Sequence, residues 1–107
     1  VSECVEATYR LMQSDFCGPV NIGSEEMISM NDFAQMVIDI SGTQLSIYNI
    51  DGKEFEDKYG HKCPIGVNGR NSDNRLYREK IGWEVSQSLE TGMKDTYSWV
   101  KKQVDKK

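Results

Sequence analysis

Gly69-Arg70-Asn71-Ser72-Asp73-Asn74 is the stretch of sequence around which the rest of the chain is organised. It places the guanidinium of Arg70 just ahead of a predicted helix over 73–81, with Ser72 as the N-cap. The first N–H groups of a helix are unpaired and favour negative charge. Since an arginine binds a phosphate through two parallel hydrogen bonds, the stretch indicates a phosphate-bearing ligand. The alternative interpretation is a plain turn and cap with a solvated Arg70.

The composition predicts one small soluble domain, because 107 residues with 37% hydrophobic and 28% charged residues fit a globular chain. The net charge of −4, with both signs mixed, excludes a large basic surface for nucleic acid. No apolar run reaches the length of a membrane span, and no secretory signal is recognised. The chain opens without an initiator Met, so we expect a piece cut from a longer protein.

The cysteines and the histidine give no sign of a metal or catalytic site. Cys4, Cys17 and Cys63 are odd in number and form no C-x-x-C pair, so neither zinc nor a disulfide framework is indicated. Reduced thiols in a cytoplasmic protein are expected. His61 is the only histidine, and no Ser-His-Asp or Cys-His set can be assembled around it.

Hydrophobic periodicity and capping residues predict the remaining elements. Helices are expected over 2–13, between a Ser29 N-cap and Gly42, over 73–81, and from a Ser88 N-cap onward. In the helix over 73–81, Leu76 and Ile81 are predicted to face the core.

The segments between these helices predict little regular structure. Short strands are expected over 19–23 and 45–50. The polar segment 51–66 is predicted to be a mobile surface loop with one helical turn near 54–58. The order of elements indicates an α/β class with two or three short strands and about four helices. Such a small sheet does not stand alone, which favours the tail of a larger α/β protein.

Two further patterns have simple structural interpretations. Tyr97 and Lys101 match Y-x-x-x-K, but no glycine-rich dinucleotide loop accompanies them and Tyr97 belongs to an apolar stripe, so core packing is favoured. Glu25 and Glu26 are adjacent and do not face a common point, so they are interpreted as solvated charges.

Three motifs together resemble a known family. They are Val20-Asn21-Ile22-Gly23-Ser24, the stretch 69–74, and Glu79-Lys80-Ile81-Gly82-Trp83. They resemble the C-terminal portion of extended short-chain dehydrogenase/reductases, specifically the NAD-dependent sugar-nucleotide epimerases and dehydratases. The G-R-N-S-D-N run is the narrowest of the three and is most similar to the 3,5-epimerase branch.

This resemblance implies that residues 1–107 are a small C-terminal sugar-nucleotide-binding domain, with the Rossmann half that binds NAD absent. It implies that Arg70 contacts the substrate diphosphate and that Asn71 lies beside it. The implied partner is a sugar nucleotide, GDP-mannose first, and the implied parent enzyme is an isomerase and a homodimer. The catalytic residues of the family lie upstream, so this part alone is expected to be inactive.

Two alternatives remain open at this point. The first alternative is part of a 4-epimerase or 4,6-dehydratase that acts on a UDP- or dTDP-sugar. The second is a non-catalytic nucleotide-sugar binding or interaction module that kept the fold.

Overall fold

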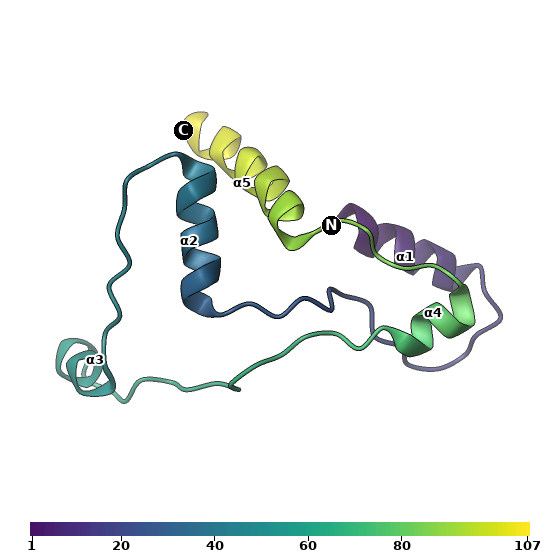
Figure 1. The fold of residues 1–107 in the computed structure, drawn as a ribbon, viewed down its shortest axis with the longest axis horizontal. Coiled ribbons are helices and arrows are strands. Elements are labelled where there is room, and N and C mark those ends of the chain that lie inside the picture. Colours follow the sequence, from purple (N-terminus) through teal and green to yellow (C-terminus); the bar gives the residue numbers. More distant parts are fainter. The chain divides into compact units, whose positions relative to one another are not determined.

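The computed structural model describes residues 1–107 and contains five α-helices. They are α1 (Ser2–Met12), α2 (Met30–Ser41), α3 (Gly52–Tyr59), α4 (Arg75–Ile81) and α5 (Leu89–Asp105) (Figure 1). The chain divides into two compact units. The first unit joins Val1–Ile28 to Asn71–Lys107 and holds α1, α4 and α5; the second is Ser29–Arg70 and holds α2 and α3.

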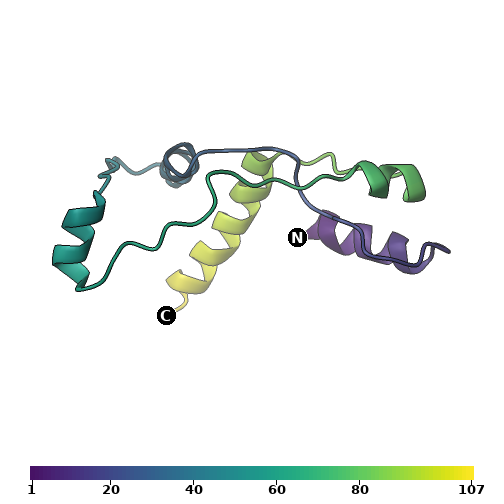
Figure 2. The same cartoon turned by 90° about the horizontal axis from the view of Figure 1, so that it is seen from below.

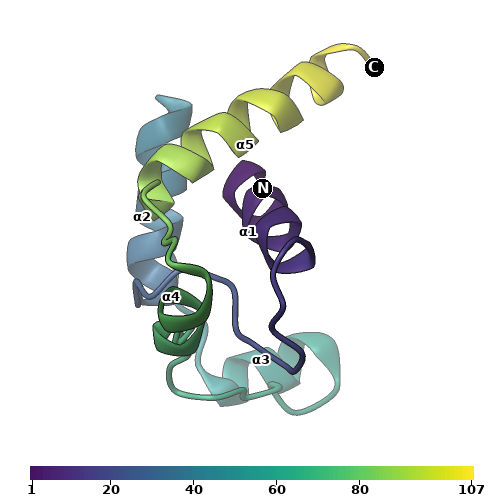
Figure 3. The ribbon, with the colours of Figure 1, turned by 90° about the vertical axis from the view of Figure 1, so that its right-hand side faces the viewer.

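The structure contains no β-strand, so the predicted α/β class is corrected to a helical one for these residues. The expected strands over 19–23 and 45–50 are irregular connections, and Figures 2 and 3 draw no arrow at either place. A strand is stable only when its backbone groups are paired across a ladder. Neither segment meets such a partner within the chain, because no ladder of backbone hydrogen bonds is formed.

The predicted ends of two helices are confirmed. The Ser29 hydroxyl accepts the N–H of Asp32 at 3.0 Å, and α2 ends at Gly42, whose φ of 69° lies in the left-handed region. The Ser88 hydroxyl accepts the N–H of Thr91 at 3.2 Å and starts α5. These ends depend on neighbouring residues alone, which is why the local sequence identifies them.

Segment 51–66 contains a longer helix than the single turn predicted there. The Asp51 carboxylate accepts the N–H of Glu54 at 2.8 Å, and Gly60, with φ of 75°, ends the helix. Asp51 and Glu54 therefore form a D-x-x-E capping pair, which stabilises the eight residues of α3. The hydroxyl of Tyr48 donates to the carboxylate of Glu54 at 2.7 Å and joins the preceding connection to α3.

Helix α4 differs from its prediction in both its start and its buried face. It begins at Arg75 rather than at Asp73, and Ser72 does not cap it, because the Ser72 hydroxyl donates to Oδ1 of Asn74 at 2.6 Å. Leu76, predicted to face the core, is 40% exposed, whereas Tyr77 is only 3% exposed. The buried aromatic side chain carries a hydroxyl, and a hydroxyl is buried only where it finds a partner.

That partner joins α4 to α1. The Tyr77 hydroxyl donates to the carbonyl oxygen of Ala7, the other buried apolar residue, at 2.8 Å. Burial raises the pKa of this phenol. The Trp83 ring meets Tyr77 edge to face, with centroids 6.1 Å apart, and the Arg10 guanidinium lies 5.6 Å from the Trp83 ring centroid. These contacts join α4 and the residue after it to α1.

A single carboxylate joins the start of α1 to the connection before α5. Oε1 of Glu3 accepts the N–H of Ser86 at 2.7 Å, the Ser86 hydroxyl at 3.0 Å and the N–H of Gln87 at 3.0 Å. The Ser86 N–H is the main reason that the pKa of Glu3 is lowered from its ordinary value of 4.5, while partial burial opposes the shift. Because all three donors favour the ionised form, this contact depends on the charge of Glu3.

Glu3→Gln is expected to loosen this connection. A lowered pKa in the folded state means that the contact contributes stability above the ordinary pKa of 4.5 and loses it as the pH falls through the lowered value. Hydrogen-exchange protection of the Ser86 and Gln87 amides should therefore decrease below about pH 4.5 in the native protein. In Glu3→Gln these amides should be less protected at pH 7 and lose this pH dependence. Glu6→Gln is the control, since Glu6 pairs only with Arg10 on its own helix; equal protection in both variants would contradict the role of Glu3.

Candidate functional site

The two sequence motifs that predict a ligand site lie against each other in the first unit. The N–H of Ser72 donates to the carbonyl of Ser24 at 2.9 Å, and Nδ2 of Asn74 donates to the carbonyl of Gly23 at 2.6 Å. Nδ2 of Asn71 donates to the carbonyl of Glu25 at 2.9 Å. These three bonds hold residues 71–74 against residues 23–25, although the bonded pairs are 46 to 51 positions apart in the sequence.

Gly23 is required at this contact because of space rather than backbone conformation. A Cβ added there would lie 2.9 Å from Cβ of Ser72, closer than side chains tolerate. The same approach buries Asn74, which is only 5% exposed and is satisfied by Gly23 on one side and by the Ser72 hydroxyl on the other. The G-R-N-S-D-N stretch is therefore rigidly anchored from Asn71 onward.

Glu25 and Glu26, interpreted from the sequence as solvated charges, are both structural. Glu25 pairs with the Arg78 guanidinium on α4. Oε2 of Glu26 accepts the N–H of Leu89 at 2.7 Å, so this carboxylate sits at the start of α5, where negative charge is favourable. Both carboxylates are exposed, as the sequence predicts, but their partners lie 53 and 63 residues away, where no local pattern indicates them.

Arg70 is exposed and forms no hydrogen bond or ion pair. Of the four arginines, it is the only one without a hydrogen bond or an ion pair. Arg10 pairs with Glu6, Arg75 with Asp73, and Arg78 with Glu25. Arg70 is thus an arginine whose donors are all available, and it directly precedes the anchored residue Asn71.

The helix start predicted to assist Arg70 already carries a negative charge. Asp73 already occupies it: Oδ1 of Asp73 accepts the N–H of Arg75 at 3.1 Å, and the same carboxylate accepts the Arg75 guanidinium at 2.6 and 2.9 Å. The Arg75 side chain lowers the pKa of Asp73 to about 2, so this carboxylate is ionised near neutral pH. The negative charge of Asp73 at the start of α4 opposes the binding of an anion there, so a phosphate would rely on the Arg70 guanidinium.

Asn71 has a fixed side chain. One N–H of its amide is used by the carbonyl of Glu25, which leaves the exposed Oδ1 as a free acceptor. An acceptor suits a hydroxyl group rather than a phosphate oxygen. The structure therefore separates the two candidate residues, since Arg70 offers donors and Asn71 offers an anchor with one acceptor.

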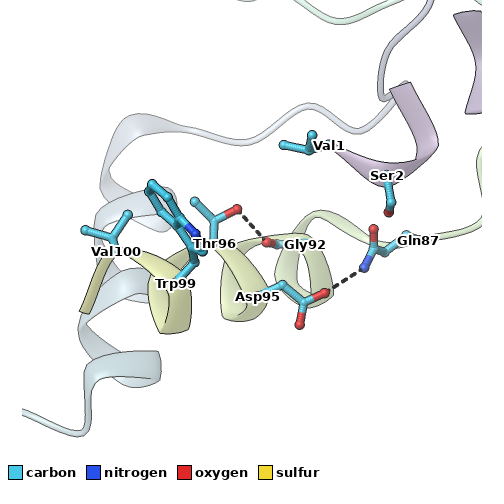
Figure 4. Close-up of a pocket in the computed structure, with 8 residues that line it drawn as sticks. All are labelled: Val1, Ser2, Gln87, Gly92, Asp95, Thr96, Trp99 and Val100. Carbon is cyan, nitrogen blue, oxygen red and sulfur yellow. Dashed lines mark hydrogen bonds between the residues drawn. The ribbon is translucent and has the colours of Figure 1, made fainter. Parts of the chain in front are cut away.

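Two cavities of the first unit lack the charge that a diphosphate needs. One, of about 550 Å³, lies along α5, and its only ionisable side chain is Asp95, which accepts a hydrogen bond from Gln87 at 3.2 Å (Figure 4). The other, of about 670 Å³, includes Arg75, but that cation is already paired with Asp73 and is accompanied by Glu79. Arg70 lines neither cavity.

Other site types find no support among residues 1–107. A dinucleotide needs a glycine-rich turn between a parallel strand and a helix. The chain has no G-x-G-x-x-G run and no strand, so its residues do not fit NAD. No group of side chains is arranged to hold a metal ion, and the three cysteines are unpaired. None of the five helices combines the length and apolar character that crossing a bilayer requires.

Comparison with known proteins confirms the predicted resemblance. The chain is 46% identical over 106 residues to GDP-mannose 3,5-epimerase of Arabidopsis thaliana and 44% identical over 106 residues to GDP-mannose 3,5-epimerase 1 of Oryza sativa subsp. japonica. Each alignment covers 99% of this chain and 25% of the relative. The chain therefore spans about a quarter of the length of these enzymes. No family model matches it.

A more distant similarity concerns a second enzyme type. The chain is 27% identical over 93 residues to UDP-glucuronic acid decarboxylase 5 of Arabidopsis thaliana, across 87% of the chain and 24% of the relative. Both enzyme names refer to sugar nucleotides, and they differ in the nucleoside base.

Proposed function

We propose that this chain is the substrate-binding part of a longer sugar-nucleotide epimerase of the GDP-mannose 3,5-epimerase type. The similarity to these epimerases over nearly the whole chain carries the proposal. It agrees with a separate observation, because the narrowest motif contains the one arginine that is exposed and unpaired. In this proposal Arg70 binds the diphosphate of GDP-mannose.

The physical role of Arg70 is to position the substrate rather than to react with it. Its planar guanidinium can form two parallel hydrogen bonds with the diphosphate, and this fixes the orientation of the nucleotide as well as its affinity. The hydrogen bonds from residues 71–74 to residues 23–25 hold the backbone next to Arg70 in place. Binding energy gained at the diphosphate can accelerate a reaction at the sugar by holding the sugar in the reactive geometry.

Asn71 supports this position mainly through its bond to Glu25. Its free Oδ1 would accept a hydroxyl group of the bound nucleotide or sugar. NAD would be bound outside residues 1–107, by the part of the enzyme that this chain does not include. Residues 1–107 alone are expected to be inactive, because the catalytic residues of such enzymes would lie in the part that this chain does not include.

A panel of sugar nucleotides tests the proposal in the full-length protein. We expect GDP-mannose to be converted to a C3 or C5 epimer, detected by proton NMR, and UDP-glucose, UDP-glucuronic acid and dTDP-glucose to remain unchanged. Turnover restricted to UDP- or dTDP-sugars would instead assign the chain to a 4-epimerase, dehydratase or decarboxylase type. The 27% identity to a UDP-glucuronic acid decarboxylase makes this the second candidate. Binding without turnover of any member would indicate a non-catalytic module.

A further inference from the structure

Asn68 is the only asparagine of this chain that is followed by a glycine. The backbone nitrogen of the residue after an asparagine can attack the side-chain amide carbon of that asparagine and close a succinimide ring. Glycine allows this attack most readily, because it has no Cβ to obstruct the approach and its backbone reaches conformations closed to other residues. The dipeptide Asn68-Gly69 therefore has the composition of a spontaneously reactive site.

The structure leaves both reacting groups of this dipeptide accessible. Asn68 and Gly69 are exposed, and they lie in the irregular connection between α3 and α4, where the chain bends at Asn68 (Figure 1). Within the second unit, neither the side-chain amide of Asn68 nor the N–H of Gly69 forms a hydrogen bond. No helix or ladder therefore holds the Gly69 nitrogen away from the Asn68 side chain.

Asn71, which lies only three positions further along the chain, is held in a way that prevents the same reaction. The N–H that would attack it belongs to Ser72 and donates to the carbonyl of Ser24 at 2.9 Å. The side-chain amide of Asn71 donates to the carbonyl of Glu25 at 2.9 Å. Because the attack requires both groups to turn toward each other, the structure distinguishes a reactive Asn68 from a protected Asn71.

The reaction replaces a neutral amide by a carboxylate. The Gly69 nitrogen loses its proton and forms a bond to Cγ of Asn68, while the bond from Cγ to the side-chain nitrogen breaks and ammonia is released. Water then opens the succinimide at either carbonyl, which leaves aspartate or isoaspartate at position 68. The only other reactant is water, and no electrons are transferred. A free side-chain carboxyl ionises near about pH 3.9, so the product is negatively charged at neutral pH.

A carboxylate at position 68 has the same spacing from Arg70 that Asp73 has from Arg75. Asp73 precedes Arg75 by two positions, and its carboxylate accepts the Arg75 guanidinium at 2.6 and 2.9 Å. Two residues span at most about 7 Å of extended chain, which is within the Debye length of about 8 Å at physiological ionic strength.

We propose that Asn68 is a site of spontaneous deamidation, and that the carboxylate formed there pairs with Arg70 and weakens the binding of a phosphate. The deamidation follows from the sequence and the structure alone, whereas its effect on binding rests on the proposed function.

Prolonged incubation of the full-length protein in a mildly alkaline buffer tests the modification, because base removes the proton of the Gly69 nitrogen. We expect a species with one further negative charge on ion exchange, and peptide mapping by mass spectrometry should place the change at Asn68. Asn71, read from the same map, should remain intact. Asn68→Gln has a side chain one methylene longer, which disfavours the ring, so position 68 should then remain intact as well. An unmodified Asn68, or an Asn71 that reacts as fast, would overturn the inference.

Asn68→Asp in freshly prepared full-length protein tests the consequence for binding. Exposed ion pairs are weak, so we expect this variant to bind GDP-mannose about 2- to 5-fold less tightly than the native protein, while Asn68→Gln binds normally. Combined with Arg70→Ala, Asn68→Asp should cause no further loss, because its partner is absent. An unchanged Kd in Asn68→Asp, or an equal further loss in the double variant, would contradict the pairing with Arg70.

The two measurements separate this inference from the proposed function. Deamidation at Asn68 in a protein that binds no sugar nucleotide contradicts the proposed function alone. Binding of GDP-mannose by a protein in which Asn68 stays intact, or in which Asn68→Asp has no effect, contradicts this inference alone.

Discussion

Replacing Arg70 by alanine in the full-length protein is expected to weaken the binding of GDP-mannose by roughly 10- to 100-fold. Hydrogen bonds to charged groups contribute about 1.5–3 kcal/mol, and each 1.4 kcal/mol is a tenfold change in Kd. Arg70 has no internal partner, so its removal leaves no unpaired carboxylate and should not affect folding. Titration calorimetry with GDP-mannose and with GDP measures the effect, which should be the same for both because they share the diphosphate.

Two matched variants make this test specific. Arg70→Lys keeps the charge but loses the paired geometry, so it should bind with an affinity between those of the native protein and Arg70→Ala. Arg75→Ala removes another exposed arginine, but one whose charge is already compensated by Asp73, and it should bind normally. An unchanged Kd in Arg70→Ala, or an equal loss in Arg75→Ala, would remove Arg70 from the site.

Gly23→Ala is expected to destabilise the protein by about 1–3 kcal/mol, the usual cost of overpacking a close contact. The new methyl group would lie 2.9 Å from Cβ of Ser72, so residues 71–74 must move away from residues 23–25. Because Arg70 is attached to this segment, binding of GDP-mannose should weaken together with stability. Denaturant unfolding and calorimetry on the same sample measure the two effects.

Two further variants test whether the destabilisation by Gly23→Ala is steric. Gly52→Ala, on α3, adds the same methyl group where no atom lies within 4 Å, and it should be neutral or slightly stabilising. Ser72→Gly removes the opposing Cβ, so the double variant Gly23→Ala with Ser72→Gly should be more stable than the sum of the two single effects predicts. Strict additivity would show that contact between these two residues is not the cause.

The parts of the fold that the sequence predicts are those determined by residues close together in the chain. The N-caps at Ser29 and Ser88 and the glycine that ends α2 require only neighbours three or four positions away. The Asp51 and Glu54 pair is a signal of the same local kind for α3, since its D-x-x-E spacing can be read from the sequence. The strand predicted over 19–23 is absent for a different reason. A strand needs a second strand to pair with, and the sequence of the segment itself does not specify one.

The sequence identifies Arg70 as the candidate binding residue but does not predict the contacts around it. The G-R-N-S-D-N run singled out Arg70, and the structure finds it exposed and unpaired. The contacts that fix its surroundings could not be predicted, because Glu25 reaches Arg78 and Gly23 reaches Asn74 across more than 50 residues. The assignment of Ser72 as a cap failed because its hydroxyl donates to Asn74 instead of accepting from the helix.

The first unit is built from two separate stretches of chain, and the bond between Glu25 and Asn71 brings their ends close together. Residues 29–70 therefore leave the first unit and return to it at nearly the same place. A segment of another length or composition could replace them without breaking any bond described for the first unit.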